Sequence, residues 1–472
     1  MTGLSSVPVE LLQHITSSLP LQDVLALRLT DRAVSAKVTD KRFEQCFVER
    51  TCDLSTRSLE ALSAIAAHPT LGSVVQKITL VTAITDEVAS KRIVETGYKS
   101  IGRTPKRPTI DVKCTDAEVA AAQEALDTLQ ETKADRERLR SSGNDLAILT
   151  DVFTRLGKLV TLSLEAGVFT GGGRQGRRHA SAAGNWYGVR DRKCLWTMAA
   201  HDFSIVLQAM VRARICVEDM LVYQGGWGCS VMSVEIGSLV AKMPKADLEA
   251  TLSSLKSLSI SITHDSLETL GEDRKNSKVD WSWLADDEIA QRFALVLSTA
   301  RGLERLDIRH VRGHYYAKVR ENLDLFRTIA NKAAASQLRS LTLRGFGARQ
   351  SDLLCLLRKS PGLEELELNE VALRTGKWSP VFHHLEHQKH QLRQLTMFRC
   401  YEESLVQITR PAGAGVDTEP WVAPHESVHT RTWRMSGQQV RAGVECTRVA
   451  EKWGGSINTD RWIEWHRREY RF

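Results

Sequence analysis

Residues 383–387 have the types and spacing of a zinc site. They read HHLEH and so match H-x-x-E-H, the pattern of one class of zinc peptidases. On a helix, His383 and His387 would lie one turn apart on a common face, and Glu386 would be placed as a general base. Glu464 is a conceivable third ligand. Because the motif lies between two predicted strands, with no sign of a closed substrate cleft nearby, we treat a zinc hydrolase as a remote alternative and predict no metal ligands.

A basic, glycine-rich segment is the second candidate for chemistry. Residues 171–178 read GGGRQGRR, which has the glycine spacing of a phosphate-binding loop but has Arg177 where that loop needs lysine. Together with Arg174 and Arg178, this arginine could contact phosphate or form a nuclear-localisation signal. The whole chain carries a net charge of only +7 over 472 residues. We therefore predict a mobile loop and expect no nucleic-acid partner.

Cysteine usage and hydropathy indicate the compartment. The nine cysteines are scattered, and no pair has C-x-x-C spacing. No stretch approaches about 18 consecutive apolar residues, the length that a membrane-spanning helix needs, and the first residues do not read as a signal peptide. Hydrophobic residues make up 42% and charged residues 26%, as in folded domains. We expect a reduced protein of the cytoplasm, the nucleus or both, without a membrane segment and without a cofactor.

A repeated leucine pattern predicts the elements that would position these residues. The pattern is apolar-x-x-apolar-x-apolar, and its last two positions suit a short strand with one buried face. Helix-like segments separate successive copies, and alternation of strand and helix every 20–35 residues or so is typical of a parallel solenoid with outer helices. The six strong copies are Leu159/Leu162/Leu164, Leu255/Leu258/Ile260, Leu303/Leu306/Ile308, Leu338/Leu341/Leu343, Leu363/Leu366/Leu368 and Leu392/Leu395/Met397; Val75/Ile78/Leu80 and Val217/Met220/Val222 are weaker copies.

Insertions interrupt this repeated body, which we place at residues 51–408. Within the first insertion, an Ala/Glu/Lys/Arg-rich stretch over 115–140 predicts a long helix that begins with a capping box of Thr115 and Glu118. Arg309 and Arg344 follow predicted strands and are candidate contacts for an anionic client. We expect the inserted loops at residues 97–145, 167–193 and 264–280.

Residues 409–472 differ in composition from the repeated body. They contain several tryptophans, among them Trp433, Trp453, Trp462 and Trp465, within alternating Thr/Val/Arg segments. A short hairpin and helix here would cover the open end of a solenoid. The alternative is an aromatic platform for a ligand or for single-stranded nucleic acid. We favour a capping extension, because an open solenoid end exposes core.

Residues 1–50 predict three short helices. Pro8 stands at the start of the first, where its missing N–H costs nothing, Pro20 ends it, and Asp31 caps the third. Forty residues cannot form an independent core around this many leucines, so part of their surface needs a partner or the rest of the chain. The apolar side chains of the first two helices are Leu11, Leu12, Ile15, Leu19, Val24, Leu25 and Leu27.

This segment resembles an F-box. The family pattern is a Leu-Pro-x-Glu-Leu-Leu start, a later apolar residue, a Leu-Pro hinge, an Asp-Leu-Leu element and a Leu-Arg pair. The matching residues are Val7-Pro8-Val9-Glu10-Leu11-Leu12, Ile15, Leu19-Pro20, Asp23-Val24-Leu25 and Leu27-Arg28; the aromatic residue often found in the third helix is missing, with Val34 in that region. An F-box followed by irregular leucine-rich repeats is similar to the large class of fungal F-box proteins.

The resemblance implies an α/β fold, with a small three-helix F-box at 1–50 and then an irregular leucine-rich-repeat solenoid with a parallel sheet and outer helices. It also implies a non-catalytic, substrate-recognition subunit of a ubiquitin ligase. The F-box would dock on the Skp-family adaptor of a cullin–RING ligase, and the repeats would bind a client protein whose identity the sequence leaves open. The residues implied for adaptor binding are Pro8, Leu11, Leu12, Ile15, Leu19, Val24, Leu25 and Leu27.

The first alternative belongs to another class of protein. It is a leucine-rich interaction scaffold without a ligase role, in which the N-terminal helices only cap the first repeat.

Overall fold

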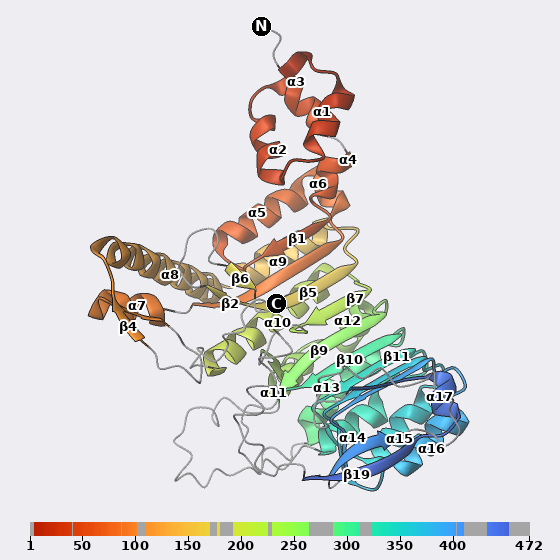
Figure 1. Ribbon diagram of the computed structural model, residues 1–472. Coiled ribbons are helices and arrows are strands. Elements are labelled where there is room, and N and C mark those ends of the chain that lie inside the picture. Colours follow the sequence, from red (N-terminus) through yellow and green to blue (C-terminus); the bar gives the residue numbers. More distant parts are fainter. Residues whose placement is uncertain are drawn as a thin grey trace.

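The computed structural model shows an α/β chain built around a large, mostly parallel sheet, with helices along one face and small helices at the N-terminal end (Figure 1). No helix among the described residues is long and apolar enough to cross a membrane. The structure describes residues 4–39, 41–85, 87–101, 110–169, 177–179, 192–224, 229–263, 287–311, 323–402, 404–409 and 432–452.

The N-terminal helices agree with the predicted ones and add a fourth. Pro8 and Pro20 stand directly before the first two α-helices. The Asp31 carboxylate accepts a hydrogen bond from the backbone N–H of Ala33 at 2.9 Å and so caps the third, as predicted. The elements are the 3₁₀ turn Leu4–Ser6 and helices α1 (Val9–Thr16), α2 (Leu21–Arg28), α3 (Arg32–Val38) and α4 (Lys41–Gln45).

The large sheet follows the chain in order. Nine strands run parallel from one end to the other, and an antiparallel strand closes the far end. The last two residues of each of the eight predicted copies lie on these strands, and the first residue stands two positions before the strand begins. In order the strands are β1 (Glu49–Cys52), β2 (Lys77–Thr85), β5 (Thr161–Phe169), β7 (Asp219–Val222), β9 (Ser257–Thr263), β10 (Arg305–His310), β11 (Ser340–Arg344), β13 (Glu365–Asn369), β15 (Gln394–Phe398) and the antiparallel β18 (Thr432–Ser436); β6 (Arg177–His179) pairs with β5 and β8 (Val231–Met232) with β9.

Two apolar ladders cross the sheet in register. One joins the central residues of the leucine pattern, and the other joins the residues two positions later, so both ladders lie on the same face. Every side chain in them is at most 3% exposed. The ladders are Ile78, Leu162, Met220, Leu258, Leu306, Leu341, Leu366 and Leu395, and Leu80, Leu164, Val222, Ile260, Ile308, Leu343, Leu368 and Met397.

The connecting helices bury these ladders. A parallel strand must return by a crossover, and here the crossovers lie on one side of the sheet and share a single apolar core with it (Figure 1). The helices of this layer are α5 (Thr56–Ala67), α6 (Pro69–Val74), α9 (Asn144–Arg155), α10 (Arg192–Ala213), α11 (Ser233–Ala241), α12 (Lys245–Leu252), α13 (Asp287–Thr299), α14 (Leu323–Lys332), α15 (Gln350–Lys359) and α16 (Ser379–Gln388).

The first insertion is a structured arm. Its long helix and capping box are confirmed: the Thr115 hydroxyl accepts from the Glu118 N–H at 3.3 Å, and the Glu118 carboxylate accepts from the Thr115 N–H at 2.9 Å. The arm is attached to the body by Asp135, whose carboxylate accepts from the N–H and hydroxyl of Thr56 at 2.9 and 2.7 Å. The arm contains α7 (Val88–Thr96), β3 (Tyr98–Ile101), β4 (Ile110–Lys113) and α8 (Asp116–Ser142) (Figure 1).

The second insertion is shorter than the predicted 167–193. Strand β5 continues to Phe169, β6 pairs antiparallel with its end, and α10 already begins at Arg192. The prediction was too long at both ends. The glycines and charges of this segment predicted a loop, whereas residues 167–169 continue β5 and residues 192–193 begin α10. The third predicted insertion, 264–280, lies outside the described residues.

The far end of the sheet is covered by the C-terminal extension. Strand β18 pairs antiparallel with β15, α17 (Gly437–Arg441) follows, and β19 (Glu445–Lys452) joins a second, five-stranded sheet. The predicted short helix is present as α17, but β18 and β19 pair with strands of two different sheets and do not form the predicted hairpin with each other. The second sheet contains β12 (Gly347–Arg349), β14 (Ala372–Thr375), β16 (Tyr401–Glu402), β17 (Ser404–Thr409) and β19.

Lysines at helix ends connect neighbouring outer helices. Lys359, the last residue of α15, donates to the carbonyl oxygen of Asn331 near the end of α14. Lys389, which follows α16, donates in the same way to the carbonyl oxygen of Ser360 at the end of α15. A cation is favourable at a helix C-terminus. The Lys389 side chain is nevertheless only 2% exposed, and burial lowers its pKa to about 8 from the ordinary 10.5.

We predict that Lys389→Met changes the pH dependence of stability. Between about pH 8 and about pH 10.5 the unfolded chain keeps the lysine proton and the native chain releases it, so wild-type stability should rise with pH across this window. Below about pH 8 the buried charge is a penalty of at most about 3 kcal/mol. Lys389→Met should therefore remove the rise and be at least as stable near neutral pH. Urea unfolding across this pH range measures both effects.

The matched control is Lys359→Met, whose lysine makes the same kind of bond but is only partly buried. It should keep the wild-type rise. A Lys389→Met variant with an unchanged slope would show that the ammonium remains charged and hydrated in the native state.

We also predict that Gly437→Ala loosens the C-terminal extension. A Cβ at Gly437 would lie 1.7 Å from the carbonyl oxygen of Leu392, so the backbones must separate, at a cost of about 1–3 kcal/mol. Gly157→Ala is the control, since nothing lies within 4 Å of a Cβ there. Limited proteolysis should cut the extension faster only in Gly437→Ala; equal cutting in both variants would contradict the close approach.

Candidate functional site

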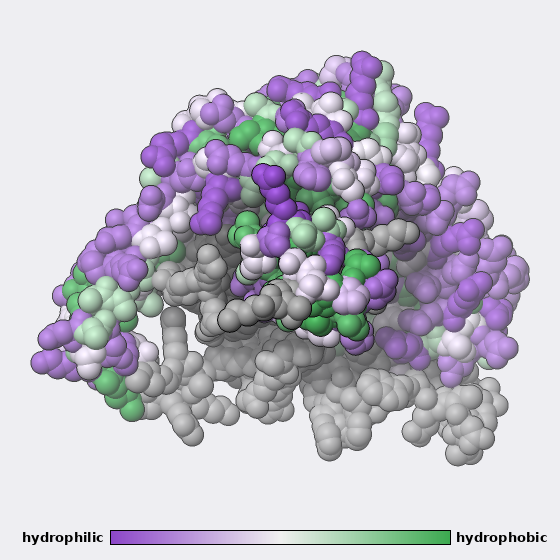
Figure 2. All heavy atoms as spheres, turned by 90° about the horizontal axis from the view of Figure 1, so that it is seen from above, coloured by the Kyte–Doolittle hydropathy of each residue, from purple (hydrophilic) through white to green (hydrophobic). Residues whose placement is uncertain are grey.

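Exposed apolar side chains gather on the N-terminal helices. Of the eleven exposed large apolar side chains among the described residues, six lie between positions 4 and 29, with Leu11 56%, Ile15 47% and Leu29 88% exposed. Hydrophobic residues alternate with polar ones near the centre of Figure 2, where this end of the molecule faces the viewer. Exposed apolar side chains gathered on so short a segment are typical of an interaction site. The six residues, called the N-terminal apolar face below, are Leu4, Val9, Leu11, Ile15, Leu25 and Leu29.

The opposite side of these helices forms two small cores. Leu12 packs with Val34 and Val38 and ties α1 to α3, with Val7 and Leu27 at the edge. The adjacent residues Leu11 and Leu12 are about 100° apart around the helix axis, which places Leu12 in this core and leaves Leu11 exposed.

The second small core connects the N-terminal helices to the body. Val24 of α2 packs with Phe43 and Phe47, and the guanidinium carbon of Arg28 lies 4.1 Å from the centre of the Phe43 ring. Partly buried residues of α5 and α6, Ile65, Leu71 and Val74, complete the cluster. These contacts hold the N-terminal helices at the start of the sheet and leave the N-terminal apolar face outside.

A lysine fixes the first turn onto the third helix. The Lys37 ammonium donates to the carbonyl oxygens of Ser5 and Val7 at 2.6 and 2.8 Å. These bonds hold the 3₁₀ turn, which carries Leu4, against α3.

The eight residues predicted for adaptor binding divide into three groups. Pro8, Leu11, Ile15 and Leu25 are exposed; Leu19 and Leu27 are partly buried; Leu12 and Val24, at 1% and 5% exposure, belong to the two small cores. Sequence reasoning missed Leu4, Val9 and Leu29 as members of the exposed set, and their apolar type beside the predicted helices was the only signal for them.

The sheet face opposite the apolar ladders is polar, and its charges are paired. Arg305 of β10 lies 2.9 Å from Asp219 of β7, across the intervening strand β9. Arg344 lies 3.5 Å from Asp307 and 3.4 Å from Glu367, so two carboxylates balance the residue that we considered as an anion contact. Arg309, the other candidate, is half-buried on β10. This face presents a row of alternating charges rather than a basic patch.

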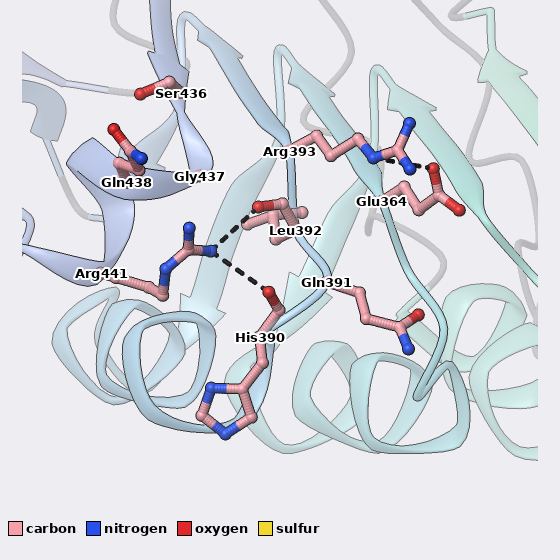
Figure 3. Close-up of a pocket in the computed structure, with 9 residues that line it drawn as sticks. All are labelled: Glu364, His390, Gln391, Leu392, Arg393, Ser436, Gly437, Gln438 and Arg441. Atoms are coloured by element: carbon pink, nitrogen blue, oxygen red, sulfur yellow. Dashed lines mark hydrogen bonds and ion pairs between the residues drawn. The ribbon is translucent and has the colours of Figure 1, made fainter.

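A hollow of about 450 Å³ lies where the sheet meets α17 (Figure 3). Arg441 donates to the carbonyl oxygens of His390 and Leu392, both at 3.3 Å, and Arg393 lies 3.2 Å from Glu364. Arg441 thus attaches α17 to the loop before β15, and Arg393 attaches that loop to the residue before β13. The hollow lies at the contact between α17 and the sheet, and we do not assign a ligand to it.

The structure brings His383, Glu386 and His387 together on α16. Each offers a ligand atom within 4.8 Å of the other two, and both histidines are exposed. Glu464 lies outside the described residues. So do Arg174, Trp453, Trp462 and Trp465, and the side chains of Arg177 and Arg178 are likewise not described. Trp433, on β18, packs against the main core, as a capping role requires.

In comparisons with known proteins, no family model matches the chain, and no curated protein matches its sequence. The functional argument therefore depends on the N-terminal apolar face, the paired charges of the sheet and the helix residues themselves.

We predict that neighbouring leucines of α1 have opposite roles. Leu12→Ala removes most of a fully buried side chain and should cost about 2–4 kcal/mol of local stability, whereas Leu11→Ala should change it by less than about 0.5 kcal/mol. Amide hydrogen exchange in α1 and α3 is the measurement, because it reports the free energy of local opening. Equal loss of protection in the two variants would show that Leu11 is also a core residue.

Proposed function

We propose that this chain is a substrate-recognition subunit of a Skp–cullin–F-box ubiquitin ligase. In this role the N-terminal helices are an F-box that docks on the Skp-family adaptor, the parallel strand–helix units are irregular leucine-rich repeats, and the repeats bind a client protein. The chain itself is not a catalyst. It brings a client lysine close to the ubiquitin-charged enzyme and so raises its effective concentration there.

The observation that carries the proposal is the N-terminal apolar face. Leu11 and Ile15 are one helical turn apart on α1, and both are about half exposed. Each large apolar side chain of this kind releases about 1.5–3 kcal/mol when it is removed from water, before the ordering costs of association. Four residues of the F-box resemblance, Pro8, Leu11, Ile15 and Leu25, are exposed and available to a partner.

The buried members of the resemblance support the same proposal in another way. Leu12 and Val24 pack inside the two small cores and hold α1 and α2 in place. We assign them to positioning the docking face rather than to contact with the adaptor. Leu19 and Leu27, partly buried at the core edges, can serve both purposes.

The polar face of the sheet is the surface that we assign to the client. Its ion pairs place positive and negative side chains next to one another on this face, as Arg305 with Asp219 and Arg344 with Asp307 and Glu367. A partner of complementary pattern would be selected by charge placement, and electrostatic complementarity mainly provides specificity. The balance of charges speaks against a client recognised only through phosphate.

One observation favours the alternative of a repeat scaffold without a ligase role. Val24 and Phe43 pack with residues of α5 and α6, so the N-terminal helices also cover the start of the repeated body. As a scaffold the chain would use these helices only as a cap. The two functions differ in whether the outer side of α1 and α2 binds a partner.

We predict that Leu11→Asp with Ile15→Asp abolishes adaptor binding while the fold is kept. Both side chains point to solvent, so the double variant should retain its circular dichroism spectrum and melting temperature, whereas two carboxylates in an apolar interface should weaken binding at least about a hundredfold. Co-purification of the full chain with a Skp-family adaptor is the measurement.

The matched control is Val88→Asp with Ile110→Asp. It makes the same charge change at two exposed apolar residues of the arm, far from α1 in the chain, and should bind like wild type. If the wild-type chain forms no complex with the adaptor, or if the α1 double variant binds equally well, the proposed docking role is wrong and the scaffold is the better account.

A further inference from the structure

The exposed side of α16 carries a compact set of metal-binding groups. The rings of His383 and His387 lie with their centres 4.1 Å apart, and Glu386 Oε2 is 3.7 Å from His387 Nδ1. Among the described residues this is the one group of three or more His, Cys, Asp or Glu whose ligand atoms all lie within 4.8 Å of one another. Two imidazoles and a carboxylate are the donor set of many zinc sites.

The helix presents this set because its other side is held in the core. Val381, Phe382 and Leu385 are buried against the sheet at 0–2% exposure and fix the rotation of α16. Residues at i, i+3 and i+4 share one helical face, so His383, Glu386 and His387 must then lie together on the outside. The site is therefore built on a rigid element.

A backbone contact selects a ligating form of His387. Its Nδ1 lies 3.0 Å from the carbonyl oxygen of His383. A carbonyl oxygen can only accept, so Nδ1 carries a proton, and in the neutral imidazole the lone pair that a metal ion needs is then on Nε2. Donation of one ring N–H to a backbone carbonyl is the arrangement that orients histidine ligands in metal sites.

We propose that His383, Glu386 and His387 form a binding site for a divalent transition-metal ion such as Zn²⁺. Bonds of about 2.0–2.2 Å hold tetrahedral donors about 3.4 Å apart, so donors now within 4.8 Å need only side-chain rotation to converge. Three protein ligands leave at least one coordination position for water or for a group from a partner. The nitrogen donors favour Zn²⁺, Ni²⁺ or Cu²⁺ over Mg²⁺.

The position of the site gives the ion a structural consequence. A Cβ at Gly443 would lie 3.8 Å from Glu386 Oε1, so the carboxylate lies beside the segment that follows α17. A metal ion at Glu386 is thus bound at the seam between the last outer helix and the C-terminal extension. Binding to the native state alone stabilises it by mass action and should raise the melting temperature with metal concentration.

This site is separate from the proposed docking function. It involves no residue of the N-terminal helices, and the histidines are open to solvent on an outer helix. Loss of metal binding and loss of adaptor binding can therefore be measured in different variants of one protein.

The test is titration of untagged, metal-free full-length protein with ZnCl₂, followed by isothermal titration calorimetry and by the melting temperature, with MgCl₂ as the control ion. We expect one Zn²⁺ per chain, a higher melting temperature with Zn²⁺, and no saturable binding of Mg²⁺. His387→Gln should weaken Zn²⁺ binding by at least about tenfold, and His383→Gln with His387→Gln should abolish it.

His14→Gln is the matched control, because it removes one exposed histidine from another helix and should bind Zn²⁺ like wild type. All these side chains are exposed, so the variants should fold, and their melting temperatures without metal check this. The site is disproved by absence of saturable Zn²⁺ binding to the wild-type chain or by equal binding to the double variant.

Discussion

The register of the apolar ladders is the constraint on which the rest of the structure depends. Each parallel strand from β2 to β15 contributes two buried side chains to one face, aligned residue by residue with its neighbours, as in Leu258, Leu306 and Leu341. A shift of one residue in any strand would turn its leucines to solvent and its polar residues into the core. The crossovers must then all pass on one side, which fixes where the outer helices lie. The register therefore also determines where the polar face of the sheet, helix α16 and the contact between the sheet and α17 lie.

Much of the fold follows from spacing that is local in the sequence. The leucine pattern predicts a strand within six residues, and the helices between copies complete a parallel order without any long-range information. Strand β1 escaped prediction because only Cys52 of its four residues is buried. Long-range contacts could not be predicted from local spacing either. The Thr82 hydroxyl of β2 is hydrogen-bonded to Asp202 of α10 at 2.7 Å and to the Tyr223 hydroxyl at 2.6 Å, and each partner is more than a hundred positions away in the sequence. From the sequence, Lys389 would be predicted to be a solvated residue after a helix. Its amine is buried only because α16 packs on α15.

The candidate sites were predictable in type but not in orientation. A list of apolar residues finds Leu11 and Leu12 equally, and only the position of α3, with Val34 and Val38, decides which one is inside. The zinc-like spacing of residues 383–387 was visible in the sequence, yet a catalytic interpretation needed a cleft, and the structure instead gives an outer helix with its histidines exposed. The same is true of Arg344. The sequence shows a basic residue at the end of a predicted strand, but it does not show that carboxylates on both neighbouring strands pair with it.

The two ends of the sheet explain why the N-terminal apolar face is not needed by the fold. At the far end, β18 pairs with β15, and Met435 and Trp433 pack on the main core. At the near end, β1 forms the edge and α4, α5 and α6 pack beside it, joined by the cluster around Phe43. Helices α1 and α3 lie beyond that cover, farthest from the sheet (Figure 1). Among the described residues, the exposed leucines of these helices cover no core, so their apolar surface lowers solubility without stabilising the fold. A surface of this kind persists where another protein covers it, and this is the physical reason for placing the docking function on α1 and α2.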